Sequence, residues 1–463
     1  MATAARTHNA QGAQTTNPSD LASVAQQVLD IVKSRVEQAE VYGYDTASTP
    51  VDFEANRLKS LETKQSRGLS LRVVKDGRIG LAATTKMGDP QLLVDQAIEL
   101  SAFGAQARFQ LPSSISSSSG NNVTVFDPAA ESLSVEQMVS LGEEMIARIR
   151  AYDSEILCEA GVRRLTETTV LLNSRGGQGQ YRKSSFALVI GGQLIRGEDF
   201  LNIWEYESAC GPNIDQQALA DAAIRKFELA KHVAKAQTKR QPVIFAPRGV
   251  AGILWGPMSA ALSGKAVYQG SSALSEKLGQ QVFDPRLTIV EDSTYSGVPS
   301  SSPFDDEGVS TRRLPLIQDG KVASFYYDLQ TAGLAGKEST GNGYRSPESL
   351  PGPHTGTIFF EPGDTSIEQM ISGIDEGLIV ESVTGNAGNI FSGDFSGNIQ
   401  GGFKIEKGQI AGRVKDTMIA GNIFQDMKQL GGISNVADWI YGQAKIPHIL
   451  FSELGVSTKS DRQ

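Results

Sequence analysis

The densest group of side chains that could carry out chemistry lies in the second half of the chain. Three consecutive carboxylates, Asp305, Asp306 and Glu307, are followed closely by Arg312 and Arg313. Carboxylate oxygens are the ligands that hard cations such as Ca²⁺ prefer, so a cation site is one interpretation. A charged turn closed by local ion pairs is the other, and the sequence favours it.

A glycine-rich segment at 339–345, STGNGYR, is the second candidate. Its backbone N–H groups and Arg345 can face an anion or a peptide carboxylate, because successive amides in such turns form anion-binding concavities. Ser339 and Asn342 are its other candidate contacts. Its glycines do not lie between a strand and a helix as a phosphate loop requires, so we do not expect a nucleotide site.

A longer glycine-rich segment at 384–402 contains Asp394 and Phe395. Glycine permits a backbone to approach a ligand or another chain closely. Tight structural turns explain the same composition equally well, so both interpretations stay open. We include Asp394 and Phe395 among the candidate contacts to substrate or partner.

Familiar catalytic motifs are missing from the sequence. The four histidines are His8, His232, His354 and His448. No two of them lie within one helical turn, which excludes an HExxH pair, and neither GxSxG nor GxxxxGK[ST] occurs. Cys158 and Cys210 give no CxxC and no disulfide framework, which fits a reducing cytosol. A hydrolase that uses a serine or aspartate from the polar loops remains an alternative.

The segment 252–264, GILWGPMSAALSG, has the strand-to-helix pattern of a catalytic element but lacks the side chains that catalysis uses. It follows an apolar run at 241–247, so the pattern predicts a strand that leads into a short helix. Pro257 suits a first helical turn and Gly264 suits a C-terminal cap. The segment contains no His, Cys, Asp, Glu, Lys or Arg, so we expect a helix shaped for packing against another chain.

Composition excludes several function classes. The chain has 463 residues and a formal net charge of −9, which argues against a surface that displaces counterions from nucleic acid. The one dense basic patch, at 225–240, fits a solvated helix end. No stretch approaches the roughly 18 apolar residues of a membrane helix, and the N-terminus lacks a secretory apolar region. We expect a cytoplasmic protein with a disordered tail over 1–19.

Hydrophobic periodicity predicts an α+β fold. Residues 20–110 follow the order helix, strands, helix. A Ser-rich linker at 111–122 separates them from 123–240, where the same order recurs, so we expect a duplication. From 241 to 455, short apolar runs alternate with Gly, Asn, Ser and Pro, which predicts a β-rich C-terminal domain. We expect the binding groove where 252–264 meets the glycine-rich loops, between the N-terminal region and this domain.

Five segments taken together resemble the TldD/PmbA family. In chain order they are GLSLRVVKDGRIGLAAT, SSPFDDEGVSTRRLPLIQDG, STGNGYR, FSGDFSG and GGFKIEKGQIAGRVKDTMIAGNIFQDM, within about residues 35–430. The combination of PFDDEG, STGNG and SGDFS resembles the PmbA (TldE) branch more than the TldD branch. The resemblance implies a subunit of a cytosolic protease of peptides and unfolded segments. Family members are also linked by name to modulation of DNA gyrase.

The resemblance also implies where a metal would be bound. In TldD-type members the strand-to-helix segment carries HExxxH, in which two histidines bind zinc and the glutamate activates water. The matching positions here are Trp255, Gly256 and Ala260, and none of them can bind a metal or move a proton. The family's C-terminal cysteine ligand has no counterpart, and His448 alone cannot replace three ligands. We expect no catalytic residue and no cofactor in this chain, with zinc only in a TldD-like partner.

Three functions compete at this point. The favoured one is a metal-free PmbA/TldE-like subunit that pairs with a TldD-like paralogue, or with itself, and holds an extended peptide by strand addition. The alternatives are a standalone non-metal hydrolase and a regulatory protein that binds DNA gyrase. Whether this chain is itself an enzyme is not decided by its sequence. The candidate contacts to substrate or partner are Asp305, Asp306, Glu307, Ser339, Asn342, Arg345, Asp394 and Phe395.

Overall fold

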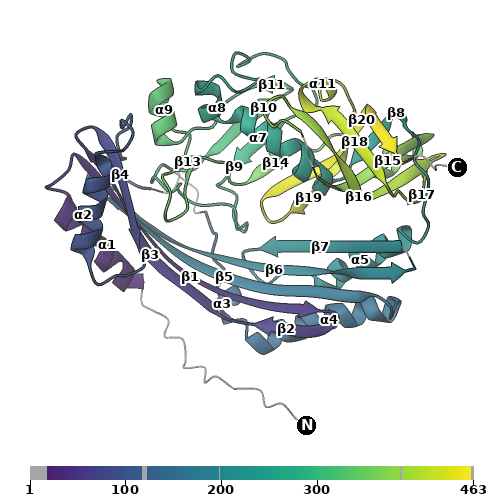
Figure 1. Cartoon of the computed structure of the whole chain (residues 1–463), viewed down its shortest axis with the longest axis horizontal. Helices are drawn as coiled ribbons and strands as arrows, with labels where there is room; N and C mark the ends of the chain where they lie inside the picture. The colour runs from purple at the N-terminus through teal and green to yellow at the C-terminus, as the bar shows by residue number, and fades with distance from the viewer. Residues whose placement is uncertain (1–17, 117–122, 198, 386–387, 460–463) are drawn as a thin grey trace, which may run out of the picture.

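The computed structural model describes residues 18–116, 123–197, 199–385 and 388–459. A curved antiparallel sheet forms one half of the molecule and faces a β-rich half across the middle (Figure 1). The expected α+β class with a β-rich C-terminal region is confirmed. The expected N-terminal tail lies outside the described residues as far as residue 17, and the first helix begins at Pro18.

The first half is a seven-stranded sheet covered by helices. Its strands are β1 (Gln38–Glu54), β2 (Arg57–Leu61), β3 (Lys64–Lys75), β4 (Arg78–Thr84), β5 (Leu157–Asn173), β6 (Gln178–Arg196) and β7 (Asp199–Ala209). Their order is β4-β3-β1-β5-β6-β7, with β2 paired to β1. The helices are α1 (Pro18–Val32), α2 (Pro90–Ser101), α3 (Pro128–Ser132), α4 (Val135–Tyr152) and α5 (Gln216–Leu229).

The helix–strands–helix order occurs in both N-terminal parts, and the two parts share one sheet. Strands β1 and β5 pair antiparallel from Glu40 opposite Asn173 to Phe53 opposite Ala160. Helices α1 and α2 pack on β1, β3 and β4, while α4 and α5 pack on β5 to β7. Figure 1 shows α1, α2 and α4 on the face that points away from the β-rich half. The opposite face is therefore left to contact that half.

A closed barrel forms the centre of the second half. Strands β8 (Lys239–Phe245), β15 (Glu376–Thr384), β16 (Asp394–Glu406), β18 (Thr417–Asn422) and β20 (Ala444–Thr458) pair in this order, and β20 returns to β8. Closure leaves these five strands without a free edge. The other strands of this sheet are β9 (Ile289–Asp292), β10 (Arg313–Gln318), β11 (Lys321–Val322), β14 (Ile358–Phe360), β17 (Gln409–Arg413) and β19 (Leu430–Ile440).

Short elements connect the barrel strands. They are α6 (Pro247–Gly249), the π-helical turn η1 (Val250–Trp255), α7 (Gly256–Leu262), α8 (Gly264–Tyr268), α9 (Leu329–Ala335), β12 (Gly343–Tyr344), β13 (Gly352–Pro353), α10 (Ile367–Ser372) and α11 (Ile423–Asp426). No helix among the residues placed by the structure is long and apolar enough to cross a membrane.

Three phenylalanines stabilise the barrel interior. Phe245 of β8 contacts Phe395 of β16 and Phe451 of β20, with ring centroids 6.2 and 5.5 Å apart and the rings edge to face. All three side chains are buried. Such edge-to-face pairs add to the free energy gained by burying the rings. Phe245 therefore links three of the five barrel strands.

We predict that Phe245→Ala lowers the free energy of unfolding by about 3–5 kcal/mol, because it leaves a cavity between these rings. Urea unfolding followed by circular dichroism measures the change. Phe391→Ala is the matched control: that side chain is 47% exposed, so its loss should cost less than about 0.5 kcal/mol. Equal costs for the two variants would contradict this account of the core.

Candidate functional site

The strand-to-helix frame predicted for 241–264 is present. Strand β8 ends at Phe245 and leads through α6 and η1 into α7. Pro257 lies in the first turn of α7, where its missing N–H is tolerated. The expected glycine cap is wrong, because α7 ends at Leu262 with Ser263 in an extended conformation. Gly264 serves close packing instead: a Cβ there would lie 2.2 Å from the Tyr327 ring.

The three positions matched to the family's metal motif lie on this helical segment. Trp255 is half-buried and packs edge to face on Phe360, with centroids 5.8 Å apart. Gly256 is exposed, and a Cβ there would meet nothing within 4 Å, while Ala260 is half-buried. Over the described ranges, no group of three or more His, Cys, Asp or Glu side chains could hold a metal ion. The side chains of Trp255, Gly256 and Ala260 carry none of the nitrogen, sulfur or carboxylate groups that bind zinc in proteins.

The acidic loop binds its own backbone. The Asp305 carboxylate accepts hydrogen bonds from the amides of Glu307 at 3.0 Å, Val309 at 2.9 Å and Gly343 at 2.8 Å. Its side chain is buried, and this burial raises its pKa. Asp305 thus closes the turn and ties it to β12. This carboxylate is used for structure, so it is not available as a cation ligand or a substrate contact.

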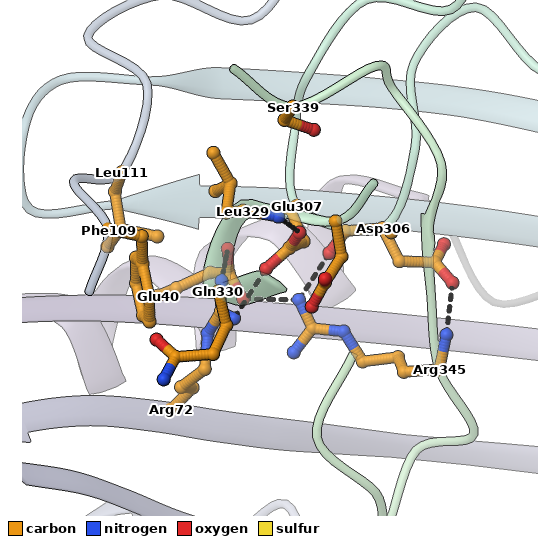
Figure 2. Close-up of polar contacts among 12 residues, drawn as sticks. Glu40, Arg72, Phe109, Leu111, Asp306, Glu307, Leu329, Gln330, Ser339 and Arg345 are labelled. Atoms are coloured by element: carbon orange, nitrogen blue, oxygen red, sulfur yellow. Dashed lines mark hydrogen bonds and ion pairs between the residues drawn. The ribbon is translucent and has the colours of Figure 1, made fainter. Parts of the chain in front are cut away.

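A buried cluster of two arginines and two glutamates joins the two halves of the molecule (Figure 2). The Arg72 guanidinium on β3 lies 2.9 Å from the Glu40 carboxylate on β1 and 2.6 Å from the Glu307 carboxylate. Arg345 binds the second oxygen of Glu40 and the backbone oxygen of Asp306. All four side chains are at most 3% exposed. Glu40 and Arg72 come from the sheet, and Glu307 and Arg345 come from the β-rich half.

The protonation of this cluster follows from its burial. Burial disfavours the charge of Glu40, but Arg345 and Arg72 outweigh it, so the pKa of Glu40 is lowered. Burial raises the pKa of Glu307, against the effect of Arg72. Glu307 also accepts the amide of Leu329, the first residue of α9, at 2.6 Å. The expected local ion pairs with Arg312 and Arg313 are wrong: Arg313 pairs with Glu361, and Arg312 donates to the Ser339 carbonyl.

The glycine-rich turn at 339–345 is brought next to the acidic loop, but its amides are occupied. The amides of Gly343 and Arg345 donate to the carboxylates of Asp305 and Asp306. The Asn342 side chain donates to the His354 carbonyl at 3.1 Å. The two amides bind carboxylates of the protein itself, so they are not free to bind an external anion.

Three other candidate residues also have structural partners. Ser339 donates to the Tyr327 carbonyl at 3.2 Å. Asp394 is exposed and accepts hydrogen bonds from Ser392 at 2.6 Å and from Asn422 at 2.8 Å. Phe395 is only 2% exposed because it fills the barrel core, so the contact that we expected from it with a substrate or partner is wrong. Asp394 and Phe395 belong to the barrel and not to the charge cluster.

A cleft lies where the sheet meets the barrel. A cavity of about 410 Å³ is lined by Leu201 to Trp204 of β7, by Gly252 of η1 and by Gly401 and Gly402 of β16. The expected groove between 252–264 and the glycine-rich segment is found here. A second cavity of about 630 Å³ adjoins it along β7. Both cavities are lined by Lys226, Arg248 and Glu381.

Sequence reasoning did not single out Glu40, Arg72, Lys226 or Arg248. A signal existed for the first two, since each is a lone charge within an apolar strand pattern, in AEVYGY and LSLRVV. A buried charge needs a partner. No comparable signal existed for Lys226 and Arg248, because their partners come from other elements of the fold.

The sheet, the closed barrel and the helix beside the cleft form a fold that also occurs in solved structures. The fold matches a crystal structure of TldE from Thermococcus kodakarensis with a TM-score of 0.86 over 94% of this chain and 100% of that chain, at 22% sequence identity. Models for the PmbA/TldA metallopeptidase C-terminal domain and for domain 1 of that metallopeptidase match residues 238–458 and 39–101. The chain belongs to the TldD/PmbA family.

Curated relatives match most of the length of the chain. Metalloprotease PmbA of Escherichia coli O157:H7 is 26% identical over 88% of this chain and 89% of its own length. A protein named metalloprotease from Methanothermobacter thermautotrophicus is 22% identical over 88% of this chain and 90% of its own. The chain is thus similar to members of a protease family over most of its length.

Asp306 lies beside the cluster, since its backbone oxygen accepts a hydrogen bond from Arg345. Its side chain makes the free energy of unfolding depend on pH. Burial raises the pKa of Asp306 to about 6, against the effect of the Arg345 guanidinium. The folded state then holds this proton more tightly than the unfolded state, where the pKa is near 3.8. Its stabilising contribution is complete below pH 3.8 and is lost as the pH rises through 6.

We predict that the free energy of unfolding falls by roughly 2–3 kcal/mol more in the wild type than in Asp306→Asn between pH 4 and pH 7.5. Asparagine keeps an acceptor for the Arg345 amide but does not titrate. Urea unfolding at the two pH values measures the difference. Asp394→Asn is the control on an exposed carboxylate. A wild type and an Asp306→Asn variant with parallel pH profiles would rule out this assignment.

Proposed function

We propose that this chain is a metal-free, PmbA/TldE-like subunit that pairs with a TldD-like metalloprotease chain in the cytoplasm and helps to hold its peptide substrate. One observation carries the proposal. The helical segment that the resemblance matches to the zinc motif of TldD-type members lies beside the cleft, and the matched positions are Trp255, Gly256 and Ala260. Neither an indole, a hydrogen nor a methyl group can bind zinc or activate water.

The surroundings of this helix support a binding role. Gly252 lines the cavity of about 410 Å³, and Gly256, one turn further along, is exposed with open space around it. The cavity also includes backbone from β7 and β16, so an extended chain can approach protein backbone there. An unfolded peptide segment is the ligand that suits such a surface.

The alternative of a standalone hydrolase has less support. It requires a nucleophile held by a general base. Its candidates, Asp306, Asn342 and Asp394, each bind neighbouring backbone or side-chain groups in the fold. Binding to DNA gyrase, the other alternative, stays a prediction that the contacts within this chain do not test.

The proposal predicts that peptidase activity requires two chains. The wild-type chain should cleave a fluorogenic unstructured peptide no faster than buffer, and a mixture with a TldD-like chain should cleave it in a chelator-sensitive manner. Size-exclusion chromatography of the same mixture should give a complex. Substitution of the zinc-site glutamate in the partner should abolish cleavage by the mixture. Gly88→Ala in this chain, at an exposed glycine with open space around it and away from both cavities, should leave cleavage unchanged. Chelator-resistant cleavage by this chain alone would refute the proposal.

A further inference from the structure

Four strands of the β-rich half place a row of side chains on the outer face of their sheet. Val290 of β9 lies opposite Phe359 of β14, and Phe359 lies beside Lys445 of β20. Lys445 in turn lies opposite Trp439 of β19. Neighbours in register direct their side chains to the same face, and Ile358, the residue before Phe359, points into the core of this half. The row therefore lies on the surface, where Phe359, Lys445 and Trp439 are half-buried.

Three aromatic rings contact one another on this face. The ring centroid of Tyr295, in the loop after β9, lies 5.2 Å from that of Phe359 and 5.6 Å from that of Trp439. The Phe359 and Trp439 centroids are themselves 5.6 Å apart. Tyr295 is 43% exposed although it packs on two other rings. Aromatic side chains at a surface are enriched where another molecule binds, because they offer a large apolar area with few rotatable bonds.

A third cavity, of about 260 Å³, adjoins these rings. Tyr295 and Phe359 line it together with Val290, Ala437 and Lys445. Pockets for drug-sized ligands measure roughly 300–1,000 Å³, so this cavity suits a single side chain. Ala437 and Lys445 also line the cavity of about 630 Å³ that lies along β7 and β19 (Figure 1). A longer molecule whose last residue enters the small cavity therefore has room to continue into the larger one.

The ammonium group of Lys445 has no counter-ion in this cavity. Among the described residues it forms neither an ion pair nor a hydrogen bond, and its one polar contact is with an aromatic ring. The other charges of the lining have partners: Arg313 pairs with Glu361 at 3.1 Å, and the Asp292 carboxylate accepts hydrogen bonds from the amide and the hydroxyl of Thr294. A half-buried ammonium without a carboxylate partner is the group that an anionic ligand would satisfy.

The position of Lys445 also decides the charge of the ligand. Its ammonium lies 5.9 Å from the Trp439 ring centroid, within the range of a cation–π contact. A second cation that approached the same rings would be repelled by Lys445. A carboxylate would instead accept a charge-assisted hydrogen bond from Lys445, while an aromatic ring attached to it could pack on Tyr295 and Phe359. The lining thus selects an aromatic carboxylate.

We propose that this cavity binds the C-terminal residue of a peptide when that residue is aromatic. Its ring packs on Tyr295 and Phe359, and its carboxylate binds Lys445. The site goes beyond the proposed function, because all of its residues belong to this chain and it requires no TldD-like partner. A free aromatic amino acid carries the same ring and carboxylate, but only a peptide also occupies the adjoining cavity, so the peptide is the ligand assigned here.

The first test is isothermal titration calorimetry of the wild-type chain with N-acetyl-alanyl-alanyl-phenylalanine as the free acid. Its C-terminal amide should bind about 10-fold more weakly or worse, the factor that one hydrogen bond to a charged group provides. The peptide with alanine in place of phenylalanine should lose a similar factor, because no ring is buried. Free phenylalanine should also bind more weakly than the acid peptide. Equal Kd values in any of these three comparisons would overturn the proposal.

Variants of the chain test the two contacts separately. Lys445→Gln should bind the acid and the amide with the same Kd, because the charge that distinguishes them is gone. Lys428→Gln is the matched control, since this lysine is exposed and lines none of the three cavities, and it should keep the preference for the acid. Tyr295→Ala should weaken binding of the phenylalanine peptide and leave that of the alanine peptide unchanged. A preference for the acid that persists in Lys445→Gln would contradict the assignment.

Photo-crosslinking locates the site without any variant. A peptide whose last residue is a phenylalanine with a diazirine on its ring should label residues within 290–295, 358–362 or 437–445, as mapped by mass spectrometry. Labelling confined to other segments would overturn the site. The label should persist in a mixture with a TldD-like chain, and its loss there would show that the partner covers this face and would equally overturn it. None of these results depends on cleavage by the two-chain mixture, so the two proposals fail separately.

Discussion

The shared Glu40 carboxylate, held between the guanidinium groups of Arg72 and Arg345, fixes the sheet to the β-rich half. Glu307 completes the cluster from the opposite side. Removing one member of such a buried pair costs about 3–5 kcal/mol, because an unpaired charge stays behind, although replacing the whole cluster by apolar groups can cost nothing. The charge cluster therefore contributes more to the fixed arrangement of the two halves than to the net free energy of folding.

That geometry determines the cleft. The sheet gives one face to its helices and the other to the barrel, and the charge cluster sets how the two halves meet. Strand β7, the helical segment around Gly252 and the strand around Gly401 then enclose the cavities between them. The cluster carries no ligand of its own. Its carboxylates bind the two guanidinium groups, while Arg72 Nε and the Nε and Nη1 atoms of Arg345 are buried without a hydrogen-bond partner among the described residues.

We propose that the helix beside the cleft has the position of a catalytic helix without catalytic side chains. Trp255 contacts Phe360, and Gly256 has open space around it. Strand β8, the π-helical turn η1 and Pro257 position this helix. The proposal of a metal-free subunit rests on Trp255, Gly256 and Ala260 and not on family membership.

The sequence predicted the elements well and their partners poorly. Alternation and turn residues identified the strands, and the apolar run before Gly252 identified the strand-to-helix frame, because these are local patterns. Arg72 and Glu307 are 235 positions apart, so no local pattern shows that they pair. Phe395 lies in a glycine-rich run that indicates a loop, but its strand closes the barrel and buries the ring. Gly264 was assigned to a cap from its position alone, whereas contact with Tyr327 explains it.

The most direct test of the central claim is the metal content of the wild-type chain, purified from zinc-supplemented cells and measured by inductively coupled plasma mass spectrometry. The TldD-like chain, purified in the same way, is the reference. The account predicts about one zinc per TldD-like chain and only background zinc in this one, with no change in this chain's thermal midpoint on chelation. One tightly held zinc per copy of this chain, lost together with folded stability on chelation, would contradict it.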